Sequence, residues 1–145
     1  MADTDYAIIK FNARDNPIFK NAEQADLSVE EIKSIDKIIF NCIDNYNAEQ
    51  KKIIADHAKT DTRLPGYPYN IDDLVIDPTK YKRQYIPTIN AKGEKEVWIN
   101  FFCNYDDRDW KKEIILVMDG GNCYFQLKIN LTTKKYFDFY VNGNG

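Results

Sequence analysis

The alternation of apolar and polar residues between Cys123 and Leu131 constrains the fold more than any other feature of the chain. Successive side chains of a β-strand point to opposite faces of a sheet, so a period of two places an apolar row on one face. Another part of the chain must cover that row. The segment therefore predicts a sheet with a covering layer, and the row consists of Cys123, Phe125, Leu127, Ile129 and Leu131.

A long amphipathic helix upstream is the predicted cover. Ser28 and Glu31 have the spacing of a capping box, in which each side chain bonds a backbone N–H that the first helical turn leaves free. Leu27 precedes the cap and is placed to pack on Ile32 as a hydrophobic staple. The pattern allows the helix to continue through Ala58. Its apolar stripe repeats every three or four residues and comprises Ile32, Ile35, Ile39, Cys42, Ile43 and Tyr46.

Several further strands are expected around this helix. Residues 6–11 predict a short strand, and residues 81–89 and 95–103 predict a hairpin whose turn contains Gly93, which can adopt the positive φ that such a turn needs. Pro87 has no backbone donor, so its strand is expected at a sheet edge. Residues 112–118 predict another strand.

The last strand is predicted at residues 135–141, with Phe137, Phe139 and Val141 facing inward. The glycines of residues 119–122 are typical of a hairpin turn, because a phosphate loop needs a helix beyond them and a strand is expected here. The fold class is therefore α+β: a curved antiparallel β-sheet of four to six strands packed on one long N-terminal α-helix. One domain is expected to span residues 1–145.

The segment from residue 60 to 79 is long and rich in prolines, which exclude regular structure around residues 64–69. Two interpretations are open. A loop of this length often carries function, whereas the preferred interpretation is a connector with a short helical turn near residues 71–75.

Composition narrows the function classes. An apolar content of 43% and an aromatic content of 14% predict a folded core. The net charge of −3 argues against a nucleic-acid binder, which needs a basic patch to neutralise phosphates. No window reaches the ~18 apolar residues of a membrane span, and the N-terminus does not predict a secretory signal. A cytoplasmic location and no membrane partner are therefore expected.

No residue combination predicts a catalytic site, a metal site or a cofactor. His57 is the single histidine, and a Cys–His pair would require a cysteine to reach it. Three widely spaced cysteines predict buried free thiols rather than a disulfide framework or a zinc site. The acidic runs at residues 72–77 and 106–109 lack the glycine and distal glutamate of a calcium loop, so solvated turns are expected.

Five aromatic residues fall on sheet positions opposite the apolar row. Tyrosine and tryptophan are enriched at interfaces because they bury a large area and keep a polar group. These residues are therefore candidate partner-binding residues. The alternative is that a curved sheet or the loop at residues 60–79 covers them. The five are Trp98, Phe102, Tyr124, Tyr136 and Tyr140.

The order of strand, helix and antiparallel meander resembles the cystatin-like arrangement, in which a sheet wraps around one long helix. Residues 39–47 are similar to the cystatin helix signature, which ends in an aromatic residue followed by asparagine. The resemblance implies this shape but no protease inhibition, because residues 84–88 lack the valine and glycine of the Gln-x-Val-x-Gly inhibitory loop and one strand too many follows the helix. Residues 81–85, 97–100 and 119–121 also resemble small uncharacterised bacterial proteins, for which no activity is implied.

The sequence favours a non-enzymatic protein-binding module, of the immunity or inhibitor type, that blocks a partner such as a basic toxin or enzyme. Negative charge would attract that partner and aromatic residues would anchor it. One alternative is a small ligand-binding protein or enzyme of the cone-shaped nuclear-transport-factor-like fold, with Asp138 as a candidate polar group. Alternation places Asp138 outward, against this alternative. A third hypothesis is a homodimer formed through the outer face of the sheet.

Overall fold

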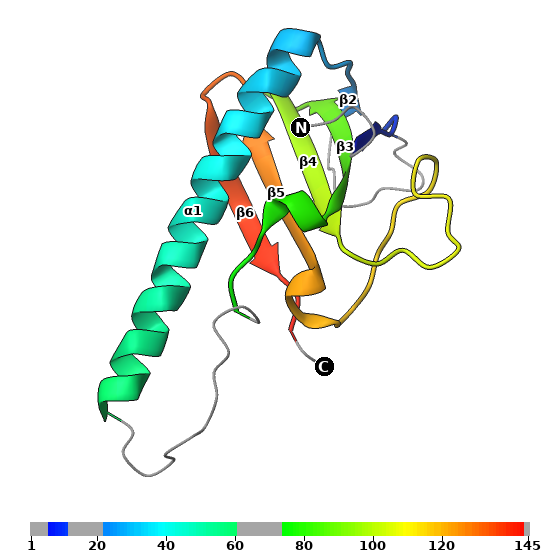
Figure 1. Ribbon diagram of the computed structural model, residues 1–145. Coiled ribbons are helices and arrows are strands. Elements are labelled where there is room, and N and C mark those ends of the chain that lie inside the picture. The colour runs from blue at the N-terminus through cyan, green and yellow to red at the C-terminus, as the bar shows by residue number, and fades with distance from the viewer. Residues whose placement is uncertain (1–5, 12–21, 61–73, 144–145) are drawn as a thin grey trace.

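One long helix packs on a mixed sheet of six strands in the computed structural model, which describes residues 6–11, 22–60 and 74–143 (Figure 1). The α+β class is thereby confirmed. The elements are β1 (Tyr6–Ile8), β2 (Glu23–Gln24), α1 (Val29–Thr60), the 3₁₀ turn η3 (Pro78–Lys80), β3 (Lys82–Ile89), β4 (Lys95–Phe102), the 3₁₀ turn η4 (Gly121–Cys123), β5 (Tyr124–Asn130) and β6 (Lys135–Val141).

The strand order is β1-β3-β4-β5-β6, and β3 to β6 form the expected antiparallel meander. The sheet as a whole is not purely antiparallel, because β1 runs parallel to β3. The short strand β2 pairs antiparallel with the other end of β3, at Thr88 and Ile89. The prediction that Pro87 lies on an edge strand is therefore wrong, because β3 pairs with β4 on one side and with β1 and β2 on the other. Pro87 lies between the stretches of β3 that pair with β1 and β2, where no strand needs its missing N–H.

The helix begins with the predicted capping box. The Ser28 backbone N–H donates to Glu31 Oε1 at 2.9 Å, and the Glu31 N–H donates to Ser28 Oγ at 3.1 Å. Lys95 Nζ lies 3.1 Å from the same carboxylate and ties the helix start to β4. Burial alone raises the pKa of Glu31, but the bonds from Ser28 and Lys95 outweigh it and hold this pKa below its ordinary value.

Helix α1 covers one face of the sheet, as the alternation predicts. The buried stripe of α1 meets the buried rings and aliphatic chains of β4 and β5 in a single core. The Phe101 and Phe125 rings stack there with centroids 4.3 Å apart. The last turns of α1 extend beyond the sheet (Figure 1). Core residues that make this contact include Ile35, Ile39, Cys42 and Ile43 from α1 and Val97, Ile99, Phe101, Phe125, Leu127 and Ile129 from the strands.

The strand predicted at residues 112–118 is not formed. Residues 103–123, here called the outer loop, connect β4 to β5 on the side of the sheet away from α1 (Figure 1). Ile115 and Val117 still face inward and pack on Phe102 and Tyr124, while Leu116 and Met118 are exposed. The segment thus alternates as a strand would, but it lies across the sheet as a third layer. None of its described residues is a strand residue.

Two predicted side-chain directions in β6 are wrong because the strand contains a bulge. The register with β5 shifts between Gln126 and Lys128, and Asp138 adopts a positive φ of 51°. One extra residue in a strand breaks the alternation, so the residues before Asp138 take the faces opposite to those that strict alternation with the residues after it would give. As a result, Phe137 lies opposite Lys128 on the outer face. The predicted inward direction of Phe137 is therefore wrong. Asp138 is exposed, as expected, with Oδ2 3.6 Å from Lys128 Nζ.

The same bulge places Tyr136 opposite Ile129, on the face that α1 covers. Its predicted outward direction is therefore wrong. Tyr140 lies beyond the bulge, opposite Gln126, and keeps the outward direction. Phe139 and Val141 pack against the core, as predicted.

Two of the three cysteines form a disulfide, which corrects the prediction of three free thiols. Cys103 and Cys123 are 20 residues apart in sequence, with Cα atoms 5.0 Å apart. The Cys103 N–H donates to the Cys123 carbonyl at 2.9 Å, so the two residues extend the β4–β5 register by one pair. This position also removes Cys123 from the predicted core row, because it packs with the outer-face residues. Cys42 is free and buried.

Candidate protein-binding surface

Three of the five candidate partner-binding residues face away from α1 but are covered. Phe102 and Tyr124 are buried with Trp110 and Ile115 of the outer loop. Trp98 is buried in a separate cluster with Phe11 and Ile86. Their outward direction was predicted correctly, and the alternative interpretation, that they are covered, holds for all three. The cover is the outer loop and the N-terminal segment.

The other two candidates lie on strand β6. Tyr136 is half-buried beside α1, where Asn45 Nδ2 lies 3.5 Å from its hydroxyl. Tyr140 is 61% exposed on the outer face. Of the five residues, Tyr140 alone is therefore exposed to a partner.

A ladder of three amide side chains holds the outer loop on the sheet. Gln84, Asn100 and Gln126 lie directly opposite one another on β3, β4 and β5, and are here called the amide ladder. Asn100 Nδ2 donates to Gln84 Oε1 at 3.1 Å, and Gln126 Nε2 donates to Asn100 Oδ1 at 3.2 Å. Gln84 and Asn100 are fully buried, so these bonds satisfy groups that burial would otherwise penalise.

The amide ladder also bonds the backbone of the loop. Gln84 Nε2 donates to the carbonyls of Trp110 and Glu113 at 2.6 and 2.5 Å, and Gln84 Oε1 accepts from the Ile115 N–H at 3.1 Å. Asn100 Nδ2 donates to the Ile115 carbonyl at 2.6 Å. Side-chain amides thus take the place that a neighbouring strand would have in satisfying this backbone.

A further amide fixes the end of the loop beside β6. Asn142 is buried, and its Nδ2 donates to the carbonyls of Val117 and Asp119 at 2.6 and 3.0 Å. Its own N–H donates to the Tyr124 carbonyl at 3.0 Å, which places Asn142 on the outer face two residues after Tyr140. Met118 is therefore held between two anchored carbonyls next to the exposed end of β6.

Gln84→Leu is expected to lower the free energy of unfolding by about 2–3 kcal/mol, because it leaves several buried polar groups of the loop without partners. Gln126→Leu is the matched control. Gln126 is half-exposed and gives a single bond within the ladder, to Asn100 Oδ1, so a smaller loss of about 1 kcal/mol is expected. Urea unfolding measures both, and equal losses would contradict the assigned role of Gln84.

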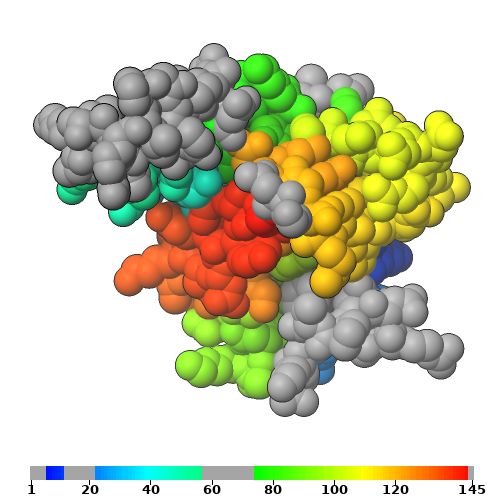
Figure 2. Space-filling model, turned by 90° about the horizontal axis from the view of Figure 1, so that it is seen from below, coloured from blue at the N-terminus to red at the C-terminus, as the bar shows by residue number. Residues whose placement is uncertain are grey.

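Three exposed apolar side chains lie on neighbouring segments. Leu116 and Met118 flank Val117, whose carbonyl Asn142 bonds, and Tyr140 of β6 precedes Asn142 by two residues. Leu116, Met118 and Tyr140 are 65%, 96% and 61% exposed, and they are here called the apolar patch. Figure 2 shows the gold and yellow atoms of the outer loop next to the red atoms of β6 on one face of the molecule. Their backbones are fixed by Asn142 and by the β5–β6 pairing, so the patch is presented on an ordered surface.

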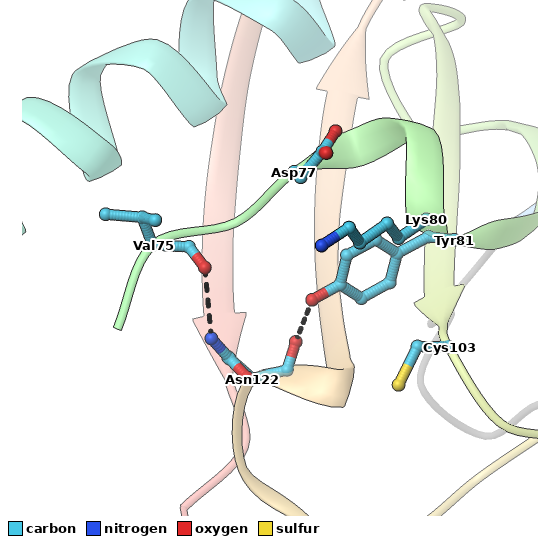
Figure 3. Close-up of a pocket in the computed structure, with 6 residues that line it drawn as sticks. All are labelled: Val75, Asp77, Lys80, Tyr81, Cys103 and Asn122. Carbon is cyan, nitrogen blue, oxygen red and sulfur yellow. Dashed lines mark hydrogen bonds between the residues drawn. The ribbon is translucent and has the colours of Figure 1, made fainter. Parts of the chain in front are cut away.

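A pocket of about 360 Å³ lies where the two ends of the outer loop, at Cys103 and Asn122, meet the segment that precedes β3 (Figure 3). Its polar groups largely bond one another: the Tyr81 hydroxyl donates to the Asn122 carbonyl at 2.5 Å, and Asn122 Nδ2 donates to the Val75 carbonyl at 3.2 Å. Burial raises the pKa of Tyr81 to about 12, so its hydroxyl remains a hydrogen-bond donor well into the alkaline range. The lining residues are Val75, Asp77, Lys80, Tyr81, Cys103 and Asn122.

Metal-ligating side chains do not cluster in the part of the chain that the structure describes. No three His, Cys, Asp or Glu side chains of residues 6–11, 22–56 and 74–143 come together to hold a metal ion. The acidic run at residues 72–77 and the side chain of His57 fall wholly or partly outside the described residues, as does the loop at residues 61–73. Along α1, no segment is long and apolar enough to cross a membrane.

Cys42 is expected to resist alkylation in the folded protein. Burial raises the pKa of its thiol to about 12, so the reactive thiolate is almost absent at pH 8. Iodoacetamide followed by mass measurement should leave Cys42 unmodified in buffer and modify it in urea. Equal labelling of folded and unfolded protein would contradict the burial of this thiol.

Sequence reasoning missed Leu116, Met118 and the amide ladder. The signal for the ladder is the presence of amides in the middle of otherwise apolar strands, where alternation alone suggests solvent. Comparison with protein-family models, curated proteins and solved structures gives no match for this chain.

Proposed function

We propose that this protein is a non-enzymatic protein-binding module whose partner contacts the outer loop and β6. The observation that carries the proposal is the apolar patch of Leu116, Met118 and Tyr140, which is exposed on a backbone that buried amides hold in place. A backbone that is already held loses little conformational entropy on binding, and exposed apolar side chains can bury apolar area against a partner.

A basic partner fits the charge around the patch. Residues 104–119 carry five acidic and three basic side chains, in a chain whose net charge is −3. Acidic groups at the rim of an apolar contact speed the approach of a basic protein and favour it over acidic competitors. This combination supports a module of the immunity or inhibitor type that blocks a basic toxin or enzyme. The cystatin-like arrangement is part of this proposal, supported by one helix lying across a meander.

The packed interior favours this function over the cone-shaped ligand binder or enzyme. The space between α1 and the sheet, where such a fold holds its ligand, is filled by one continuous cluster of side chains. Asp138 is exposed on β6 and does not face that interior. A homodimer through the outer face would have to use the apolar patch, because the outer loop covers the sheet residues beneath it.

The disulfide is relevant to the cellular compartment in which the protein functions. Disulfides persist in oxidising compartments and are rare in the cytosol, so the Cys103–Cys123 pair supports an oxidising compartment over the cytoplasm expected from the sequence. To test this, free thiols are alkylated in intact cells that produce the protein. The number of alkylated cysteines is then determined by mass spectrometry of the denatured protein. One alkylated cysteine supports the oxidising compartment, and three support the cytoplasm.

Affinity capture with paired variants tests the proposed function. Wild-type protein and Val29→Ser, which changes an exposed apolar residue far from the patch in sequence, should capture the same basic protein at low salt. Met118→Ser combined with Tyr140→Ser should lose it. High salt should weaken the capture, because the charge contribution is screened. Capture of nothing at low salt, or equal capture by all three proteins, would count against the proposal.

A further inference from the structure

The two sulfurs of the disulfide differ in their surroundings. Cys103 is exposed and lines the pocket of about 360 Å³ beside η3 and η4 (Figure 3). Cys123 is half-buried and packs against the apolar cluster of Phe102 and Tyr124. An external reagent that enters the pocket therefore meets Cys103 first.

The pocket also contains charge of both signs. Lys80 lines it, and its side chain extends alongside the Tyr81 ring (Figure 3). The carboxylate of Asp77 lines it too, but Asp77 Oδ1 accepts from the Thr79 N–H at 3.0 Å and the Thr79 hydroxyl at 2.6 Å. These bonds hold the pKa of Asp77 below its ordinary value. The Lys80 ammonium is the cationic group of the pocket that can attract an approaching thiolate.

We propose that Cys103 is a thiol-exchange site, at which a small thiol of the glutathione class opens the Cys103–Cys123 disulfide. The thiolate of the reagent attacks Cys103 Sγ and forms a mixed disulfide with it. The Cys103–Cys123 bond breaks, and Cys123 leaves as a thiolate that takes a proton from water. A second thiol of the same class then attacks the mixed disulfide, which releases the oxidised reagent and leaves both cysteines reduced.

Opening the disulfide would release one part of the outer loop. Residues 104–109 directly follow Cys103 and contact the outer face through the Tyr105 ring, which packs on Phe102 and Trp110. The backbone between Trp110 and Asp119 is instead hydrogen-bonded to Gln84, Asn100 and Asn142. The Cys103 N–H to Cys123 carbonyl bond does not depend on the sulfur bond. The fold and the apolar patch should therefore persist while residues 104–109 loosen.

To test the site, native protein is treated with reduced glutathione and its free thiols are then alkylated with N-ethylmaleimide. Mass spectrometry identifies the modification on each cysteine. The expected product carries glutathione on Cys103 and N-ethylmaleimide on Cys123. Lys80→Gln should slow its formation about three- to fivefold, whereas Lys92→Gln, an exposed lysine in the β3–β4 turn, should leave the rate unchanged. Hydrogen exchange should rise at residues 104–109 and not at residues 113–119.

Three results would overturn the proposal. One is glutathione on Cys123 rather than on Cys103. Another is an equal rate for Lys80→Gln and the wild type. The third is a disulfide that opens in urea but stays closed in the native protein at the same glutathione concentration, since the pocket would then give no access to it.

Discussion

Asp36→Ala is expected to lower the free energy of unfolding by about 3–5 kcal/mol, because it leaves the buried guanidinium of Arg83 without its counter-charge. The Arg83 side chain is fully buried between α1 and the sheet, and its Nη1 donates to Asp36 Oδ1 and to the Tyr85 hydroxyl, each at 3.0 Å. Its Nε and Nη2 are buried and find no partner among the described residues. Among the described residues, the Asp36 carboxylate alone therefore compensates the buried charge of Arg83.

Removing the other partner should cost far less. Arg83→Met keeps an apolar chain of similar length against Phe101 and removes the buried charge, while Asp36 is partly exposed and can be hydrated. A change within about 1 kcal/mol is expected. Urea unfolding of both single variants and of the double variant gives the coupling between the two residues. Equal losses for Asp36→Ala and Arg83→Met would contradict this asymmetry.

Ile39→Ala is expected to cost about 3–4 kcal/mol, because it opens a cavity at the centre of the contact between α1 and the sheet. Ile39 is fully buried in the same cluster as Phe125, Leu127 and Ile129. Phe40→Ala, one residue along the helix on its exposed side, should cost less than about 1 kcal/mol.

Thermal and urea unfolding of these two variants also test which side of α1 packs on the sheet. A small loss for Ile39→Ala, or a loss for Phe40→Ala of the same size, would mean that α1 does not use its isoleucine stripe to cover the sheet.

Local patterns were sufficient to predict the main layers of the fold. The capping box of Ser28 and Glu31 marks the start of α1, and the turn at Gly93 marks the β3–β4 hairpin. Both signals depend on residues a few positions apart, so the chain itself carries them. The alternating row of β5 predicted its cover because an apolar face cannot remain in water.

Features that depend on register could not be predicted in this way. The disulfide joins residues that become neighbours only when β4 and β5 pair, and the bulge at Asp138 reverses Tyr136 and Phe137 by inserting one residue. The parallel strand β1 is joined to β3 through the whole length of α1. None of these contacts has a signature in a short window of sequence.

The candidate surface was predicted only at Tyr140. Residues 114–118 form an unbroken apolar run, which periodicity cannot distinguish from a central strand. The structure shows that this run alternates between Ile115 and Val117, which face inward, and Leu116 and Met118, which face solvent. What replaces the neighbouring strand is the amide ladder, and the register of three strands creates it.

Photo-cross-linking from position 118 tests the proposed function most directly. A photoreactive amino acid replaces Met118 in one variant and Ile53, an exposed residue of α1, in the other, and both are irradiated in the cells that produce the protein. If the proposed function is correct, position 118 gives one discrete cross-linked product with a basic protein, and position 53 gives none with that protein. The same products from both positions, or no product from position 118, would contradict it.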